Sequence, residues 1–288
     1  MKHNIFARAA GLAAISAITL GAGTALAKDA ITIAVPSFLT GGAAGPFGIP
    51  AMNGAKMVAD AINAGKLPAP YDSKGFGGAT ATVEPIDESG GATKQVAEYR
   101  NLVEKRGVDV IVGYISSGNC QALAPIAEEL KQFTIFATCG TPRIFEEAPR
   151  KYVFRTMGHA TADNVAAAMY VKEKYPDLKG YTGINQNYAW GQDSWRDFDL
   201  TLKQIMPNST ASDKTQFPKI FAGQYGSEIS AMSLDKADLI HTSFWGGDLE
   251  AFIFQGNARG LFKQKIGVFT VGGTAAYRLG KKLPDGLV

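Results

Sequence analysis

The sequence predicts an α/β fold made of two doubly wound, Rossmann-like lobes that are joined by a hinge and face one another across a cleft. Three observations predict it. Strand-like, β-branched runs alternate with helix-like runs along most of the chain. The alternation stops in an irregular stretch at 138–156 and then restarts. The chain has 288 residues, more than one common domain needs.

The first 27 residues have the pattern of a secretory signal peptide. Lys2 and Arg8 give a positive start, an apolar stretch follows, and Ala25-Leu26-Ala27 forms a cleavage signal. The apolar stretch is too short for a membrane span. No cysteine follows the cleavage site, so a lipid anchor is not expected there. We therefore expect export to the periplasm.

The first lobe, residues 28–156, is expected to contain four strands separated by helices. The strands are expected at 31–35, 80–86, 108–112 and 133–137, the helices at 50–63, 93–105 and 119–131, and a further strand at 153–156. The run at 108–112, VDVIV, lacks polar alternation, which is typical of a parallel strand covered on both faces. Pro50 fits the first turn of a helix.

The second lobe, residues 157–288, repeats the rhythm. Helices are expected at 162–174, 194–205 and 249–258, and strands at 181–184, 239–242 and 266–270. Ligands of doubly wound sheets meet the loops at the carboxyl ends of the strands. Two such sheets facing one another form a cleft that a hinge can close. The loops that follow strands are therefore where we look for site residues.

Composition excludes several classes of partner and cofactor. The formal charge is +3, and Lys2 and Arg8 supply two of these charges, so no basic face for nucleic acid or an anionic membrane is expected. After residue 27 the sequence retains only His159 and His241, so no histidine-rich metal site is expected. The glycine-rich loops match neither a P-loop nor a dinucleotide fingerprint, so we expect no cofactor.

Cys120 and Cys139 stand at the tops of neighbouring elements, one opening a helix and one following the next strand. Their Cα atoms are expected within bridging range, about 5.5 Å. In an oxidising compartment a disulfide is favoured over two free thiols.

Hydroxyls and an aromatic side chain follow the strands of the first lobe. Ser116 and Ser117 lead directly into a helix, whose free amides make an anion site; an equal alternative is that a serine merely caps the helix. Thr141 follows the next strand at the same edge, where its hydroxyl could converge with the serines or serve only the turn. Phe47 lies in a glycine-rich loop and suits a wall for a ligand side chain.

Aromatic residues follow the strands of the second lobe. Tyr188 and Trp190 follow its first strand, and Trp245 and Asp248 follow a later one. Such clusters often line binding pockets. For Asp248 a helix N-cap is favoured over pairing with a ligand ammonium. No loop assembles a Ser-His-Asp or Cys-His set, so binding is favoured over catalysis, with a secreted hydrolase as the weaker alternative.

Taken in order, these segments resemble the type I periplasmic binding proteins of ABC importers for Leu, Ile and Val. The segments are PSFLTGGAAGPFG, NGAKMVADAIN, GYISSGNCQALAPIAEEL, TCGTP followed by YVFRT, YAWGQ and FWGGDLEAF. The resemblance implies a monomeric periplasmic receptor that binds an amino acid or related carboxylate and delivers it to ABC permease subunits in the inner membrane. Aromatic or other organic acids as ligands, or a sensor role, remain alternatives.

The resemblance also implies roles for particular residues. Ser117 would hold the ligand carboxylate, the loop at Cys139 would contribute backbone, and Thr141 would meet the amino or carboxyl end of the ligand. Phe47 would cover the ligand side chain, and Trp190 would close over it.

Two departures from the family pattern matter. The acid that usually meets the ligand ammonium falls at about Gly273, which has no carboxylate. Either Asp248 substitutes for it or the ligand lacks an α-amino group. The tail RLGKKLPDGLV also ends near the family's second crossing. We expect the later return segments to be missing, which would leave apolar surface uncovered.

Overall fold

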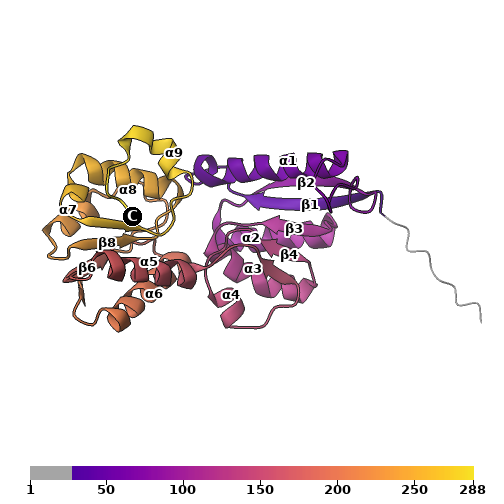
Figure 1. The fold of residues 1–288 in the computed structure, drawn as a ribbon. Coiled ribbons are helices and arrows are strands. Elements are labelled where there is room, and N and C mark those ends of the chain that lie inside the picture. The colour runs from indigo at the N-terminus through magenta and orange to yellow at the C-terminus, as the bar shows by residue number, and fades with distance from the viewer. Residues whose placement is uncertain (1–27) are drawn as a thin grey trace, which may run out of the picture.

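The structure, a computed structural model, describes residues 28–288. The predicted signal peptide lies outside these residues. Two separate parallel sheets confirm the predicted α/β class. We call the part with the five-stranded sheet lobe 1 (28–156) and the part with the four-stranded sheet lobe 2 (157–288). Figure 1 shows the lobes side by side.

Lobe 1 contains five parallel strands in the order β2-β1-β3-β4-β5. Its elements are β1 Ala30–Ser37, α1 Ile49–Ala64, β2 Thr80–Asp87, α2 Gly91–Arg100, β3 Val110–Gly113, α3 Ser117–Leu130, β4 Thr134–Phe136, α4 Arg143–Glu146 and β5 Val153–Arg155. The helix α1 covers one face of the sheet, and α2 and α3 cover the other (Figure 1). The core between the sheet and α3 contains Ile111, Leu123 and Phe136, all fully buried.

Lobe 2 contains four parallel strands in the order β7-β6-β8-β9. Its elements are α5 Ala160–Lys174, β6 Gly180–Gly183, α6 Ala189–Ile205, β7 Thr210–Ala211, α7 Gly226–Leu234, β8 Leu239–Thr242, α8 Gly246–Ala258, β9 Ile266–Phe269 and α9 Ala275–Leu279. Two apolar clusters form its core. One contains Tyr225, Phe244 and Phe252, and the other contains Tyr181 and Phe198.

The structure differs from the sequence-based expectation at several helix starts. Helix α6 begins at Ala189 instead of 194, α3 at Ser117 instead of 119, and α8 at Gly246 instead of 249. The residues before α6 and α8 are Tyr188 and Trp245, in extended conformation and with no side-chain cap. Local rules look for a capping side chain at a helix start, so they place these starts too late.

Strand β7 and helix α7 were not predicted. The strand has only two residues, too few to show a period. The helix, GSEISAMSL, buries only Ile229 and Met232 among its nine residues, so its apolar stripe is narrow.

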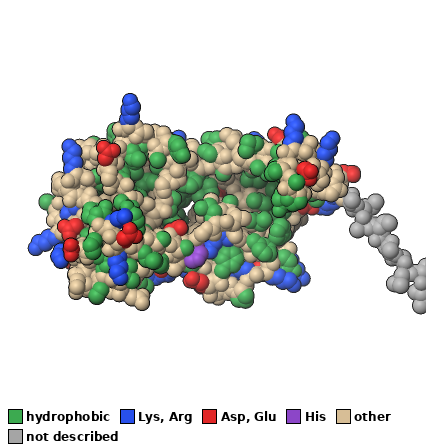
Figure 2. Space-filling view, in the orientation of Figure 1, with side chains coloured by type: hydrophobic (Ala, Val, Ile, Leu, Met, Phe, Trp, Pro, Cys, Tyr) green, Lys and Arg blue, Asp and Glu red, His purple; other side chains and the backbone are tan. Residues whose placement is uncertain are grey.

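The surface of lobe 1 contains an apolar groove of about 340 Å³ beside α1. Its walls are α1 and the neighbouring face of the sheet, including Val58, Ile62, Ile33, Val35 and Val112. On the face shown in Figure 2, positive and negative side chains are scattered without a large patch of one sign. No helix among residues 28–288 has both the length and the apolar character that crossing a membrane requires.

Candidate functional site

A cavity of about 80 Å³ lies between the lobes, near the carboxyl ends of strands from both sheets. Lobe 1 and lobe 2 both contribute to its walls. Five of the residues predicted for the site line it: Phe47, Ser117, Tyr188, Trp190 and Trp245. The other lining residues are Ile115, Thr138, Gly140, Met157, Gly158, Asp163 and Val271. Figure 2 shows the surface hollowed between the lobes.

Direct hydrogen bonds hold the lobes together around this cavity. The Gly247 amide donates to the Gly42 carbonyl at 3.0 Å, and the Ala160 amide donates to the Gly140 carbonyl at 2.8 Å. The Thr274 hydroxyl donates to the Pro46 carbonyl at 2.7 Å. Each of these bonds joins lobe 1 to lobe 2, so the structure represents a closed arrangement.

Aromatic rings form the wall opposite α3. The ring of Phe47 from lobe 1 meets Trp245 edge-on, with centroids 5.4 Å apart. The indole N–H of Trp245 donates to the Tyr188 hydroxyl at 2.7 Å, and that of Trp190 donates to the Ser243 carbonyl at 2.8 Å. Because the indole N–H groups are already paired, the rings offer mainly apolar surface to a ligand.

The start of α3 provides the polar wall. Ser116 is the residue before the helix, and no side chain caps the first turn. The Ser117 hydroxyl oxygen accepts a hydrogen bond from the Thr141 amide at 3.1 Å, and its proton can still be donated. The capping alternative is therefore not adopted. Uncapped amides and a hydroxyl at a helix start together favour an anion.

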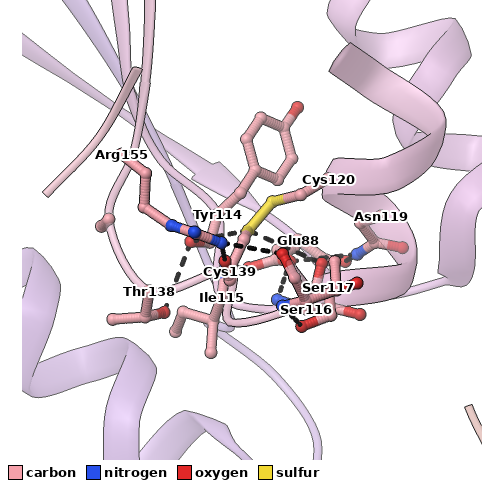
Figure 3. The surroundings of a disulfide bond; sticks show 12 residues. Glu88, Tyr114, Ile115, Ser116, Ser117, Asn119, Cys120, Thr138, Cys139 and Arg155 are labelled. Atoms are coloured by element: carbon pink, nitrogen blue, oxygen red, sulfur yellow. Dashed lines mark hydrogen bonds between the residues drawn. A yellow bond between two sulfur atoms is a disulfide. The ribbon is translucent and has the colours of Figure 1, made fainter. Parts of the chain in front are cut away.

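Glu88, directly after β2, occupies part of the anion site that the sequence analysis assigned to Ser116. Its fully buried carboxylate accepts from the amides of Ile115 and Ser116 at 2.7 and 2.8 Å and from Asn119 Nδ2 at 3.1 Å (Figure 3). Burial raises the pKa of Glu88 to about 7, although these three donors oppose the shift. Ser116 does not line the cavity with Ser117; it lines a different hollow, which Gly42 of lobe 1 and Phe221 of lobe 2 also line.

A disulfide joins Cys120, in the first turn of α3, to Cys139, in the loop after β4, with Cα atoms 6.2 Å apart (Figure 3). The Cys139 carbonyl accepts a hydrogen bond of 2.9 Å from Arg155, which also donates to the Thr141 carbonyl at 2.8 Å. Cys139 does not line the cavity. The same loop reaches the cavity at Thr138 and Gly140 instead.

A model of the family described as periplasmic binding protein matches residues 30–288, nearly all of the described chain. The chain belongs to the periplasmic binding protein family. No curated protein matches it in sequence.

Solved structures with the same fold include proteins that hold two kinds of carboxylate. A solute-binding protein of an ABC transporter from R. palustris, in complex with 4-hydroxybenzoate, has a TM-score of 0.70 and 22% identity over 85% of this chain and 62% of its own. A second R. palustris protein, in complex with benzoate, has a TM-score of 0.76 and 19% identity over 88% of this chain and 66% of its own. The branched-chain amino acid transporter protein LivJ from Streptococcus pneumoniae, in complex with isoleucine, has a TM-score of 0.71 and 17% identity over 87% and 68%.

This binding protein spans less than two thirds of the length of the first of these structures, 62% and 66% for the two from R. palustris. At these identities the likeness shows the fold. The match to the family model and to these structures supports the predicted class of periplasmic binding protein.

Two further residues predicted for the site of this binding protein, Thr141 and Asp248, form hydrogen bonds with other protein groups and do not line the cavity. The Thr141 hydroxyl donates to the Asp193 carboxylate at 2.7 Å, and Thr141 does not line the cavity. Asp248 is the third residue of α8, so the N-cap prediction is wrong. Its buried carboxylate accepts from Gln186 Nε2 at 2.6 Å and from the Phe221 amide at 2.7 Å, away from the cavity.

The structure also explains why Gly273 has no side chain. Its φ is +50°, a backbone conformation that favours glycine. An added Cβ would lie 2.7 Å from the Phe47 ring, so that ring occupies the space that an acid would need.

Sequence reasoning missed two acids at this site, Glu88 and Asp163. Glu88 directly follows β2, so applying the strand-end rule to that strand as well would have found it. Asp163 lies in the first turn of α5, which follows the crossing between lobes and no strand of lobe 2. No local signal in the sequence points to it.

Proposed function

We propose that this protein binds a small organic carboxylate between its lobes. The closed protein then delivers the ligand, chemically unchanged, to an ABC importer. The observation that carries the proposal is the composition of the cavity. The start of α3 with Ser117 faces the rings of Tyr188, Trp190 and Trp245 across a space that both lobes enclose. Such a site favours an anionic group at one end and an apolar body beside it.

The family and its fold support the coarser part of this proposal. The three solved structures described above are binding proteins of transporters, two in complex with a benzoate and one in complex with isoleucine. Both kinds of ligand combine a carboxylate with an apolar body. We propose that permease subunits in the inner membrane are the partners, and that the chain acts in the periplasm after removal of the predicted signal peptide.

A ligand screen tests the proposal. The purified protein would be titrated in a calorimeter with aliphatic and aromatic amino acids and with benzoates, after a thermal-shift screen of the same compounds. We expect at least one class to bind and to raise the melting temperature. No binding by any of these carboxylates would overturn the proposal.

Ser117→Ala tests where the carboxylate is held. Removing a hydrogen bond to a charged group is expected to weaken binding by about 1.5–3 kcal/mol. Ser227→Ala, at an exposed position on α7, is the matched control and is expected to leave the dissociation constant unchanged. Equal affinities for the Ser117 variant and the wild type would remove α3 from the site.

A further inference from the structure

A second hollow, of about 210 Å³, lies between the lobes. Lobe 1 contributes the loops after β1 and β2 and the start of α3, and lobe 2 contributes Ile220 and Phe221. The lobes touch here, since an added Cβ at Gly42 would lie 3.3 Å from the Phe221 ring. Strand β2 is at the edge of the lobe 1 sheet opposite β5, the strand that leads into the crossing. The hollow is therefore at the side of the cleft far from the crossing.

Aromatic rings separate this hollow from the cavity. No described residue lines both spaces. The Phe38 ring lines the hollow and packs against Trp245, which lines the cavity, with ring centroids 5.9 Å apart. Phe38 also meets the Phe221 ring edge-on at 5.7 Å, and both rings offer apolar surface to the hollow. The hollow is therefore a space of its own.

Two buried polar side chains that line the hollow keep unused hydrogen-bonding atoms. Ser116 is 8% exposed, and its hydrogen bonds within residues 28–288 use only its backbone amide and carbonyl. Asn119 is 4% exposed, and its Nδ2 donates to Glu88, which leaves Oδ1 without a donor among the same residues (Figure 3). Leaving a buried polar atom unpaired is costly. Both side chains therefore favour a molecule in the hollow that bonds them.

Most of the side-chain oxygens around the hollow can only accept. The hydroxyls of Thr40 and Ser89 both donate to the Asp87 carboxylate at 2.7 Å, so their lone pairs remain for another molecule. Asn119 Oδ1 is a third acceptor, and the Ser116 hydroxyl can donate or accept. An anion cannot donate, so it does not suit this set. No charged side chain among the described residues lines the hollow, so a cation would be buried without a counter-charge beside it.

A polyol matches these walls, because its hydroxyls both donate and accept and its carbon-bound hydrogens pack on aromatic rings. The volume of about 210 Å³ equals that of roughly seven water molecules at ~30 Å³ each, so the polyol has to be small. We propose that the hollow is a second binding site, which takes a small neutral polyol and thereby holds the lobes closed.

The position of the site couples it to the cavity. A molecule that contacts both lobes at the side far from the crossing stabilises the closed arrangement. It therefore raises the affinity of the cavity for a carboxylate, and the carboxylate raises the affinity for the polyol by the same factor. Only this coupling rests on the proposed function.

Direct binding tests the site without any carboxylate. Erythritol and ribitol would be titrated into the purified protein and followed by saturation-transfer difference NMR. We expect saturable binding of at least one of them. Ser116→Ala removes one neutral hydrogen bond and is expected to weaken that binding about threefold to tenfold. Ile220→Trp narrows the hollow from lobe 2 and is expected to abolish the binding.

Ser194→Ala is the matched control. Ser194, in α6, is fully buried and its hydroxyl has no partner within residues 28–288, but it does not line the hollow. Its variant should bind the polyols as wild type does. Equal binding by wild type and Ser116→Ala, or no saturable binding of either polyol, would overturn the site. Saturable binding of inorganic phosphate or ethanolamine in place of the polyols would overturn the assigned chemistry.

A second titration tests the coupling. A carboxylate that binds in the ligand screen would be titrated with and without a saturating polyol. We expect the polyol to tighten carboxylate binding about fivefold or more in wild type and to have no such effect in Ile220→Trp. An unchanged affinity in wild type would overturn the coupling. If no carboxylate binds and the polyol does, the proposed function fails and the second site is supported.

Discussion

The Asp193 carboxylate of lobe 2 accepts a hydrogen bond of 2.7 Å from the Thr141 hydroxyl of lobe 1. Arg143, also of lobe 1, donates to the other oxygen of Asp193 from Nε and Nη2 at 2.9 and 2.8 Å. Asp193 is buried, and Arg196 of its own helix completes its set of donors. These contacts join the two lobes and form a latch beside the cavity.

Thr141→Val is expected to weaken ligand binding about tenfold, mostly through faster dissociation. The substitution keeps the shape of the side chain and removes one hydrogen bond to a charged group, worth about 1.5–3 kcal/mol. The latch forms only when the lobes are closed, so the loss falls on the closed state. Stopped-flow tryptophan fluorescence would measure the dissociation rate.

Thr201→Val is the matched control for the latch. The Thr201 hydroxyl donates to the Asp197 carbonyl within α6, so its removal leaves the contact between the lobes intact. Dissociation rates that rise equally in both variants, or that stay at the wild-type value in Thr141→Val, would rule out the latch.

Gly140→Ala is expected to impair closure more strongly. An added Cβ at Gly140 would lie 2.1 Å from the Trp190 ring, far inside any allowed contact. The lobes would have to separate locally, so affinity should fall at least about tenfold while each lobe stays folded. Gly54→Ala is the control, because nothing lies within 4 Å of a Cβ there. Wild-type affinity in Gly140→Ala would contradict the closed arrangement.

His241 is expected to make the protein less stable as the pH falls below 6.5. Burial lowers the pKa of this fully buried imidazole to about 3, and its Nε2 lies 2.6 Å from Asn164 Oδ1. Between pH 6.5 and about 3 the unfolded chain binds a proton that the folded protein does not. The free energy of unfolding should therefore fall by about 1.4 kcal/mol for each pH unit through this window.

Urea unfolding of wild type and His241→Asn between pH 4.5 and 8 would measure this effect. The difference in unfolding free energy between the two proteins should be constant above pH 6.5 and should shrink below it. The contribution of Glu88 to the free energy of unfolding changes with pH in the opposite direction. Because its pKa is raised in the folded protein, this contribution falls as the pH rises from 4.5 to about 7. That contribution is common to both proteins and cancels in the difference. A difference independent of pH would refute the prediction.

Reduction of the disulfide is expected to lower stability by about 3 kcal/mol, since the bond closes a loop with a sequence separation of 19. The two cysteines also join the start of α3 to the loop with Gly140, so ligand affinity should fall as well. The double variant Cys120→Ala, Cys139→Ala would be compared with wild type in oxidising and reducing buffer. A reductant that affects both proteins equally would show that the bond does not contribute.

Much of the fold could be predicted because its signal is local. The run VDVIV at 108–112 predicts a buried parallel strand, and the structure places β3 at Val110–Gly113, which overlaps the run over three residues. The strand-end rule also led to Ser117, Tyr188 and Trp245, all of which line the cavity. Short or narrow elements such as β7 and α7 could not be predicted, because two residues or a thin apolar stripe show no period.

The sequence by itself determined the two-lobed α/β architecture and the loops that meet in the cleft. Both follow from the hydrophobic period of each segment and from the alternation of strand-like and helix-like segments, which are visible over short stretches of chain. Only the tertiary structure decided which polar groups of those loops remain available. The Glu88 carboxylate accepts a hydrogen bond from the Ser116 amide, 28 residues away in the sequence. The Asp193 carboxylate accepts one from the Thr141 hydroxyl, 52 residues away. The Asp248 carboxylate accepts one from Gln186, 62 residues away. Such partners meet only when strands pair and lobes close, and no local pattern of residues encodes that meeting.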